Sequence, residues 1–208
     1  MEELKKPRSI KVIYWMTKIT FWIFAAMSVL LFALATVLLF EVIDETQLHI
    51  GVPIGINVLE QGEAVINHQV LKVEFKEMYG KLHFIDCPAF IGKTYSYFIF
   101  IITSVSLYIF ITFKNFITNV YQGQYFERKN ILLLKRIAYA LLGVWLFTVF
   151  YGYFQYFYLV QNLEFTSITI TDKVETYPVI LLVALFTWVL SHVFIKGVEL
   201  KNENELTI

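Results

Sequence analysis

The sequence contains one cysteine, Cys87, and this excludes an internal disulfide. The motifs of common hydrolases, metalloproteases and nucleotide-binding proteins are also absent, because there is no GxSxG, no HExxH, no CxxC and no glycine-rich phosphate loop. No helix-turn-helix segment is present, so we expect no direct contact with nucleic acid. These absences predict a protein that is not an enzyme and has no catalytic residues, no cofactor and no metal.

The four histidines show no spacing typical of metal ligands. A less favoured alternative is a surface metal site that combines His68 and His83 with one of three acidic residues, Glu63, Glu74 or Asp86. We expect Cys87 to be a partly buried thiol, with an intermolecular disulfide as the alternative. An impermeant maleimide should then label this thiol from outside the cell.

Acidic and basic residues are missing from four long stretches, residues 19–40, 94–113, 137–163 and 177–195. A helix that rises about 1.5 Å per residue needs roughly 20 apolar residues to cross a hydrocarbon core about 30 Å thick. Because peptide groups in lipid must hydrogen-bond internally, such stretches are expected to be helical. The sequence therefore predicts a mainly α fold, a four-helix transmembrane bundle.

Charges are segregated between the segments that connect these stretches. Residues 1–18, 114–136 and 196–208 hold twelve Lys and Arg against six Asp and Glu, whereas residues 41–93 and 164–176 hold five against eleven. Because segments rich in Lys and Arg stay in the cytoplasm, we expect a multi-pass protein of the bacterial cytoplasmic (inner) membrane with both termini inside. The first stretch is too long for an ordinary signal-peptide core, so we expect an uncleaved helix.

Both acidic segments show patterns typical of β-strands. Apolar residues alternate over residues 48–58, 71–75 and 82–84, which predicts three short strands with an edge or a break at Pro53. Residues 165–171 are rich in β-branched side chains. Since an exposed strand edge is unfavourable, we expect the two outer loops to pair into a small extracytoplasmic β cap.

Seven aromatic rings crowd residues 150–158, near the outer end of the third apolar stretch. Aromatic side chains at such positions anchor helices in the headgroup region, which is our interpretation of this run. The alternative is a stacking platform for an aromatic or sugar ligand.

The basic segment 114–136 indicates two helix ends joined by a glycine. We expect residues 114–122 to extend the second helix, Gly123 to end it in a left-handed conformation, and residues 127–137 to resume a helix. The cations of this segment favour anionic lipid headgroups, with a partner protein as the alternative. The last three residues, Leu206-Thr207-Ile208, form a short apolar segment that we call the hook. We expect the hook to dock on this loop or on a soluble partner, with a disordered terminus as the alternative.

Two of these segments resemble a known family, the YoaS-like bacterial four-pass membrane proteins, or domain of unknown function family 2975. The resemblance rests on Gly123-Gln124-Tyr125-Phe126, Asn130 and Leu134-Lys135-Arg136-Ile137, and on the tail runs Phe194-Ile195-Lys196-Gly197-Val198-Glu199-Leu200 and Glu203-Asn204-Glu205-Leu206-Thr207-Ile208. Where family members often have Ser or Thr after the loop Phe, this chain has Glu127, which is a poorer side-chain cap.

The resemblance implies a partner but no reaction. Family members are often encoded beside a small helix-turn-helix regulator, which implies such a cytoplasmic regulator as a partner in addition to the lipid bilayer. We predict a non-enzymatic interaction or regulatory protein whose cytoplasmic interaction motif comprises Gly123, Phe126, Asn130, Leu134, Gly197, Leu200, Leu206, Thr207 and Ile208. The alternative is a small transporter or channel subunit, with a pore lined by Ser28, Thr103, Ser104, Ser106, Thr187 and Ser191.

Overall fold

The computed structural model describes residues 7–41, 49–165, 169–171 and 174–206, with backbone alone at 58–60, 75–77, 201 and 204–206. In chain order its elements are α1 (Arg8–Leu39), β1 (Ile50–Ile66), β2 (Gln69–Phe84), α2 (Ala89–Tyr121), α3 (Arg128–Gln155), the π-helix η2 (Tyr156–Val160), β3 (Thr169–Ile170) and α4 (Pro178–Leu206). The fold is mainly helical, which confirms the predicted class. The start of the first predicted strand, Leu48, lies outside the described residues.

Among the described residues, four helices are long and apolar enough to cross a membrane: α1, α2, α3 with η2, and α4. Each is longer than the uncharged stretch with which it overlaps, because the helix continues into the polar residues next to that stretch. Pro7 and Pro88 directly precede α1 and α2, and Pro178 is the first residue of α4. At these positions the missing N–H of proline costs no helical hydrogen bond.

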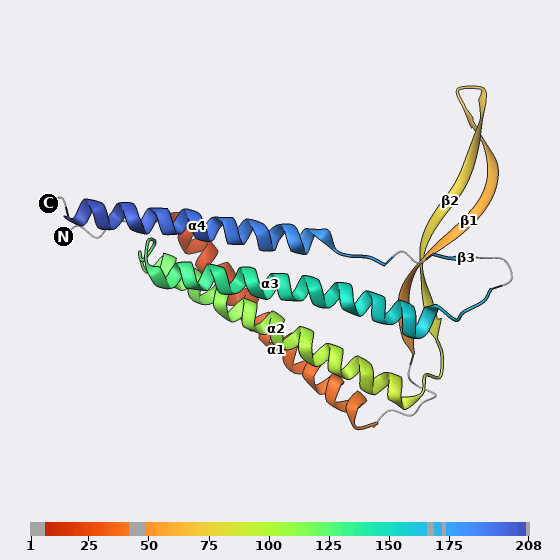
Figure 1. Ribbon diagram of the computed structural model, residues 1–208, viewed down its shortest axis with the longest axis horizontal. Helices are drawn as coiled ribbons and strands as arrows, with labels where there is room; N and C mark the ends of the chain where they lie inside the picture. The colour runs from red at the N-terminus through yellow and green to blue at the C-terminus, as the bar shows by residue number, and fades with distance from the viewer. Residues whose placement is uncertain (1–6, 42–48, 166–168, 172–173, 207–208) are drawn as a thin grey trace.

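The helices pack in chain order. α1 lies along α2, α3 lies along α4, and a less extensive contact between α2 and α3 joins the two pairs. Figure 1 shows both termini at one end of the helices, which we call the loop end because residues 122–127 connect α2 to α3 there, and the sheet at the opposite, sheet end. Among the described residues α1 and α4 share no comparable contact. The predicted bundle is therefore an open row of helices.

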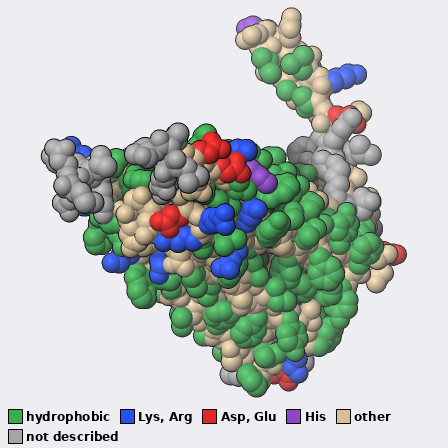
Figure 2. Space-filling view, turned by 60° about the vertical axis from the view of Figure 1, so that its left-hand side comes forward, with side chains coloured by type: hydrophobic (Ala, Val, Ile, Leu, Met, Phe, Trp, Pro, Cys, Tyr) green, Lys and Arg blue, Asp and Glu red, His purple; other side chains and the backbone are tan. Residues whose placement is uncertain are grey.

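Small side chains line the contacts between helices, and large apolar side chains face outward. Ser28, Ala35, Ser96 and Ser191 are almost fully buried, which allows close approach of helix backbones. The hydroxyl of Ser96 in α2 donates a hydrogen bond to the carbonyl oxygen of Ala35 in α1 at 2.7 Å. Figure 2 shows hydrophobic side chains over the visible flank of the helices and Lys and Arg gathered near the loop end. Such a flank suits lipid tails better than water.

β1 and β2 form one long antiparallel hairpin, so the prediction of three short strands is wrong. The register pairs Ile50 with Phe84 at the base of the hairpin and Ile66 with Gln69 at its tip. Pro53 does not break β1, which continues on both sides of it.

The position of the turn explains the error. The sequence suggests a turn at Tyr79-Gly80, but both residues lie inside β2 and are paired with β1. The chain reverses instead at Asn67-His68, whose φ angles of 50° and 64° are both positive. Two consecutive left-handed residues are typical of the type I′ turn, which matches the twist of the strands it joins.

The second acidic segment adds a short third strand. Ile170 in β3 pairs with Ile56 in β1, and the N–H of Thr171 donates to the carbonyl oxygen of Gly55 at 2.9 Å. The strand order is β2-β1-β3. This pairing confirms that the two segments form one small sheet, while residues 166–168 of the predicted strand lie outside the described residues.

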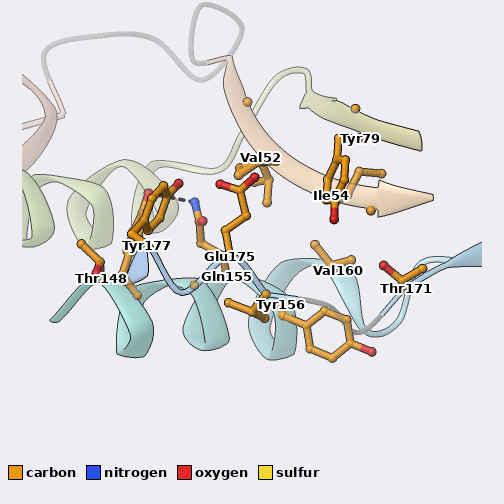
Figure 3. Close-up of a pocket in the computed structure, with 17 residues that line it drawn as sticks. Val52, Ile54, Tyr79, Thr148, Gln155, Tyr156, Val160, Thr171, Glu175 and Tyr177 are labelled. Atoms are coloured by element: carbon orange, nitrogen blue, oxygen red, sulfur yellow. Dashed lines mark hydrogen bonds between the residues drawn. The ribbon is translucent and has the colours of Figure 1, made fainter. Parts of the chain in front are cut away.

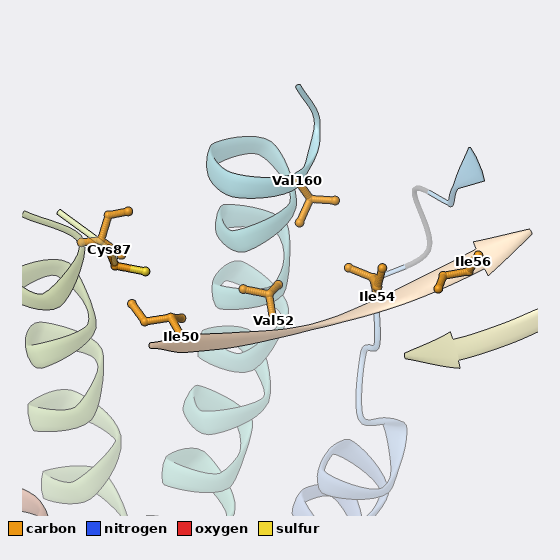
Figure 4. Close-up of a cluster of buried hydrophobic side chains, with 7 residues drawn as sticks. Ile50, Val52, Ile54, Ile56, Cys87 and Val160 are labelled. Carbon is orange, nitrogen blue, oxygen red and sulfur yellow. The ribbon is translucent and has the colours of Figure 1, made fainter. Parts of the chain in front are cut away.

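The base of the hairpin is packed on the helix ends, and its tip projects. Four alternate residues of β1 form a buried cluster with Cys87, Ile91 and Val160 (Figure 4), namely Ile50, Val52, Ile54 and Ile56. Toward the tip, apolar side chains such as those of Val65 and Val70 are exposed. Figure 1 shows this half of the hairpin standing away from the helices. The sheet therefore caps the helices with its base alone.

Candidate functional site at the loop end

Gly123 ends α2 in the conformation expected from the sequence. Its φ is 87°, its N–H donates to the carbonyl oxygen of Val120 at 3.0 Å, and the N–H of Gln124 donates to the carbonyl oxygen of Asn119 at 3.0 Å. These two bonds define a Schellman motif, which satisfies carbonyl groups that a helix end leaves free. Gly123 therefore sets the direction in which the loop leaves α2.

The buried side chain of Asn130 holds this loop in place through hydrogen bonds. Its side chain is fully buried, and its Oδ1 accepts a hydrogen bond from Nδ2 of Asn119 at 2.8 Å. Its Nδ2 donates to the carbonyl oxygen of Tyr125 at 3.1 Å and to that of Gln124. One amide thus joins the first turn of α3 to α2 and to the loop backbone.

Gly197 makes room for the ring of Phe126 on α4. A Cβ atom at Gly197 would lie 2.4 Å from two ring carbons of Phe126. The ring centroid of Phe126 is 5.8 Å from that of Phe194, which is in turn 5.8 Å from that of Phe116 in α2. The loop and the last helix, which are far apart in sequence, are therefore in direct contact.

Leu134 belongs to a cluster that joins all four helices near the loop. It is 3% exposed and packs with Phe116 and Ile117 of α2. Partly buried side chains surround this cluster, and they come from every helix: Tyr14, Val120, Leu133, Leu190 and Phe194. At the loop end, side chains of all four helices thus pack on one cluster that is centred on α2 and α3.

The remaining residues of the predicted motif are placed differently. Leu200 is 60% exposed on α4 and takes no part in this packing. Leu206 is the last residue of α4, so the segment after Lys196 continues as a helix rather than as a polar tail. Thr207 and Ile208 lie outside the described residues, and docking of the hook stays a prediction.

A groove between α3 and α4 lies beside this packed loop, and sequence reasoning missed it. It has a volume of about 320 Å³ and is lined by Arg128, Ile131, Leu132, Lys135, Ile195, Val198, Glu199 and Asn202. The sequence does contain a pattern that is consistent with this groove, because the four lining positions on each helix follow the spacing of a single helical face. The individual residues, however, do not show that the two faces meet.

The groove has an apolar floor and a basic side. Among the described residues, neither Arg128 nor Lys135 forms a salt bridge, whereas Lys196 is paired with Glu199 at 2.6 Å. Ile131 and Val198 are buried at its floor, and Leu132 is exposed beside them. This combination suits an amphipathic segment that carries acidic side chains.

The metal site considered from the sequence is not assembled by the described residues. His68 lies at the hairpin tip and His83 at its base, and no group of three His, Cys, Asp or Glu within the described residues could hold a metal ion. The hydroxyls of Ser28, Thr187 and Ser191 donate to carbonyl oxygens of their own helices. A transporter or channel subunit stays a prediction that ion flux in proteoliposomes would test.

The comparison with protein families gives one match. The family model described as protein of unknown function (DUF2975) matches residues 75–208, more than half of the chain. This region begins within β2 and includes both segments of the loop end. No curated protein and no solved structure matches the chain significantly. The chain therefore belongs to the DUF2975 family.

Proposed function

We propose that this chain is a non-enzymatic protein of the bacterial inner membrane that binds a cytoplasmic regulatory protein at its loop end. Placement of the loop end in the cytoplasm is supported by the charges of segments 1–18, 114–136 and 196–208. Together these segments hold six more Lys and Arg than Asp and Glu. The four apolar helices support the membrane location.

The groove between α3 and α4 carries the proposal. Arg128 and Lys135 are free of salt bridges within the described residues, and apolar side chains lie between them. Asn130 and Gly197 fix the loop beside the groove, so its shape exists before a partner arrives. An amphipathic helix with acidic residues fits this surface, and the family resemblance makes a small helix-turn-helix regulator the partner to test.

A crosslinking experiment with charge-matched variants tests this proposal. Arg128→Gln with Lys135→Gln removes two positive charges from the groove, and Arg8→Gln with Lys11→Gln removes two from exposed positions at the start of α1. We expect the groove variant to lose a DNA-binding regulator that the wild type and the α1 variant both retain.

The crosslinked sites give the second readout. Mass spectrometry should place the crosslinks of the regulator on the residues that line the groove. Equal recovery of the same partners by both variants would contradict the proposal. These substitutions are preferable to removing residues 197–208, because Gly197 contacts Phe126 and its loss would disturb the loop itself.

A further inference from the structure

The two halves of the β1–β2 hairpin have different surroundings. At the base, Val52 and Ile54 of β1 line a cavity together with Val160 of η2, so this half is held against the helices (Figure 3). The other half, which we call the tip half, comprises residues 60–66 and 69–75. Figure 1 shows the tip half standing away from the helices. A ribbon of only two strands is marginally stable in water, so a further strand would stabilise it.

One edge of the tip half is open along its length. In the described part of the chain, β2 pairs with β1 on one side and with no strand on the other, because the strand order is β2-β1-β3. An edge strand presents a row of backbone N–H and C=O groups that can pair with another strand. Leu71 and Val73 are 45% and 46% exposed on this edge. Val73 pairs with Gly62, so no side chain lies opposite it within the hairpin.

The charges along this edge are complementary to those of a second copy of the same edge. Lys72 and Glu74 lie on the face of β2 opposite to Val73. If two β2 strands pair antiparallel about a two-fold axis at Val73, Lys72 of each copy lies opposite Glu74 of the other copy. Moving the axis by one residue places Lys72 opposite Lys72, or Glu74 opposite Glu74, and like charges at such positions are destabilising. The edge therefore favours pairing centred on Val73.

The direction of the hairpin allows this pairing between two copies in one membrane. Figure 1 shows β1 and β2 running across the helix axes rather than along them. The two-fold axis of an antiparallel pair is perpendicular to the strands, so here it can be parallel to the helices, and both copies then keep the same orientation in the bilayer. Val73 is eleven residues from Phe84 at the base, or roughly 36 Å at about 3.3 Å per residue, so the helices of the two copies stay apart.

We propose that β2 binds β2 of a second copy of this chain. The contact joins two three-stranded sheets into one continuous sheet at the sheet end. Residues 69–77 of each copy lie opposite residues 77–69 of the other. Backbone hydrogen bonds between the two edges hold the copies together, and the pairs of Lys72 with Glu74 set the register. The dimer forms through the hairpins alone, so the loop end of each copy is left free.

Oxidative crosslinking of the purified full chain in liposomes tests the contact. In a Cys87→Ala background, Val73→Cys places a thiol on the two-fold axis, opposite the same thiol of the second copy. Val65→Cys is the control, because Val65 is 70% exposed but lies on β1, which β2 separates from the second copy. A disulfide needs Cα atoms within about 7 Å, so we expect Val73→Cys to form a covalent dimer at least about tenfold faster than Val65→Cys.

Reversal of the charges tests the register. Lys72→Glu or Glu74→Lys alone places like charges opposite each other, whereas the double variant restores both attractive pairs. All three are made in a Glu63→Gln background, because Glu63 pairs with position 72 within the hairpin. We expect each single change to raise the dissociation constant of the dimer by about tenfold, measured by single-molecule photobleaching over a range of protein-to-lipid ratios. The double variant should return to the value of Glu63→Gln alone.

Any of three results would overturn the proposal. These are equal crosslinking rates of Val73→Cys and Val65→Cys, a double variant that dimerises no better than the single ones, or a wild-type chain that stays monomeric at every ratio. Recovery in the double variant excludes misfolding as the cause of the loss in the single variants.

The hairpin contact and the regulator groove are tested separately. The variant Arg128→Gln with Lys135→Gln should dimerise as the wild type does, because its substitutions lie at the loop end. Loss of the regulator without loss of the dimer, or the reverse, therefore shows which of the two proposals fails.

Discussion

At the scale of single residues, Asn130 uses both N–H groups and the carbonyl oxygen of its amide within the loop end. Replacement by alanine would remove the side-chain partner of three polar groups, namely Nδ2 of Asn119 and the carbonyl oxygens of Gln124 and Tyr125. We expect Asn130→Ala to lower the free energy of unfolding by about 2–4 kcal/mol, measured by chemical or thermal denaturation in detergent. Asn115→Ala, at an exposed position of α2, should change it by less than about 0.5 kcal/mol. Equal effects of the two substitutions would contradict this role.

Two helical glycines should respond in opposite ways to the same substitution. Gly143→Ala meets no described atom within 4 Å and should stabilise α3 by up to about 1 kcal/mol through helix propensity. Gly197→Ala gains the same propensity, but its Cβ displaces the ring of Phe126 from α4. We expect faster proteolysis of the loop in Gly197→Ala alone. If the double variant Gly197→Ala with Phe126→Ala is not more stable than Phe126→Ala, the contact is not the cause.

Cys87 should react slowly with maleimide, which corrects the expectation of ready labelling. The thiol is 2% exposed and donates to the carbonyl oxygen of Phe84 at 3.5 Å, and burial raises its pKa. A raised pKa leaves less of the reactive thiolate near neutral pH, so the labelling rate should increase by about tenfold per pH unit up to that pKa. Rates measured against pH for native and denatured protein check this. Equal native and denatured rates at neutral pH would disprove burial.

Several residues that are important at the loop end could be predicted from the sequence, but their structural role could not. Gly123 was recognised because a helix that stops between two basic segments needs a left-handed residue, a purely local requirement. Asn130 and Gly197 were grouped as an interaction surface, whereas the structure buries Asn130 and packs the half-buried Gly197 against the ring of Phe126. Their burial depends on where α3 and α4 meet, which no local pattern records.

At the scale of elements, replacement of His68 by glycine should stabilise the turn between β1 and β2. A left-handed φ of 64° strains a side chain with a Cβ atom, and glycine avoids this strain. We expect His68→Gly to slow amide hydrogen exchange at the tip, corresponding to about 0.5–1 kcal/mol. Lys72→Gly, inside β2, should accelerate exchange by a similar amount. Faster exchange in His68→Gly would contradict the turn geometry.

The elements differ in how well their sequence specifies them. Uncharged stretches predict the helices well, because lipid imposes length and internal hydrogen bonding on each helix separately. The strands were harder, since Tyr79-Gly80 resembles a turn locally and becomes part of β2 through pairing with β1. A cavity at the sheet end is lined by three segments, namely the base of the hairpin, the last turns of α3 with η2, and the segment before α4. Because these segments are far apart in the sequence, only the cluster of aromatic residues indicated it locally.

At the scale of the whole molecule, the two ends should be accessible from opposite sides of the membrane. In a Cys87→Ala background, we expect an impermeant maleimide to label Lys72→Cys in right-side-out vesicles and to label Gln122→Cys after the vesicles are opened. Both positions are exposed, at the hairpin and at the loop end respectively. Labelling of Gln122→Cys in sealed vesicles would reverse the proposed orientation.

α3 is the element that contacts both ends of the molecule. Its first turn holds Asn130 in the packed loop, and the helix continues through η2 to Val160 beneath the sheet. Its 33 residues give a rod roughly 50 Å long, and a helix resists compression along its axis. We therefore expect a displacement at Val160 to be carried along the axis of this helix toward Asn130, except for the part that the wider π-helical turn absorbs. α3 with η2 thus forms one continuous connection between the packed loop and the base of the sheet, and its π-helical turn lies at the end next to the sheet.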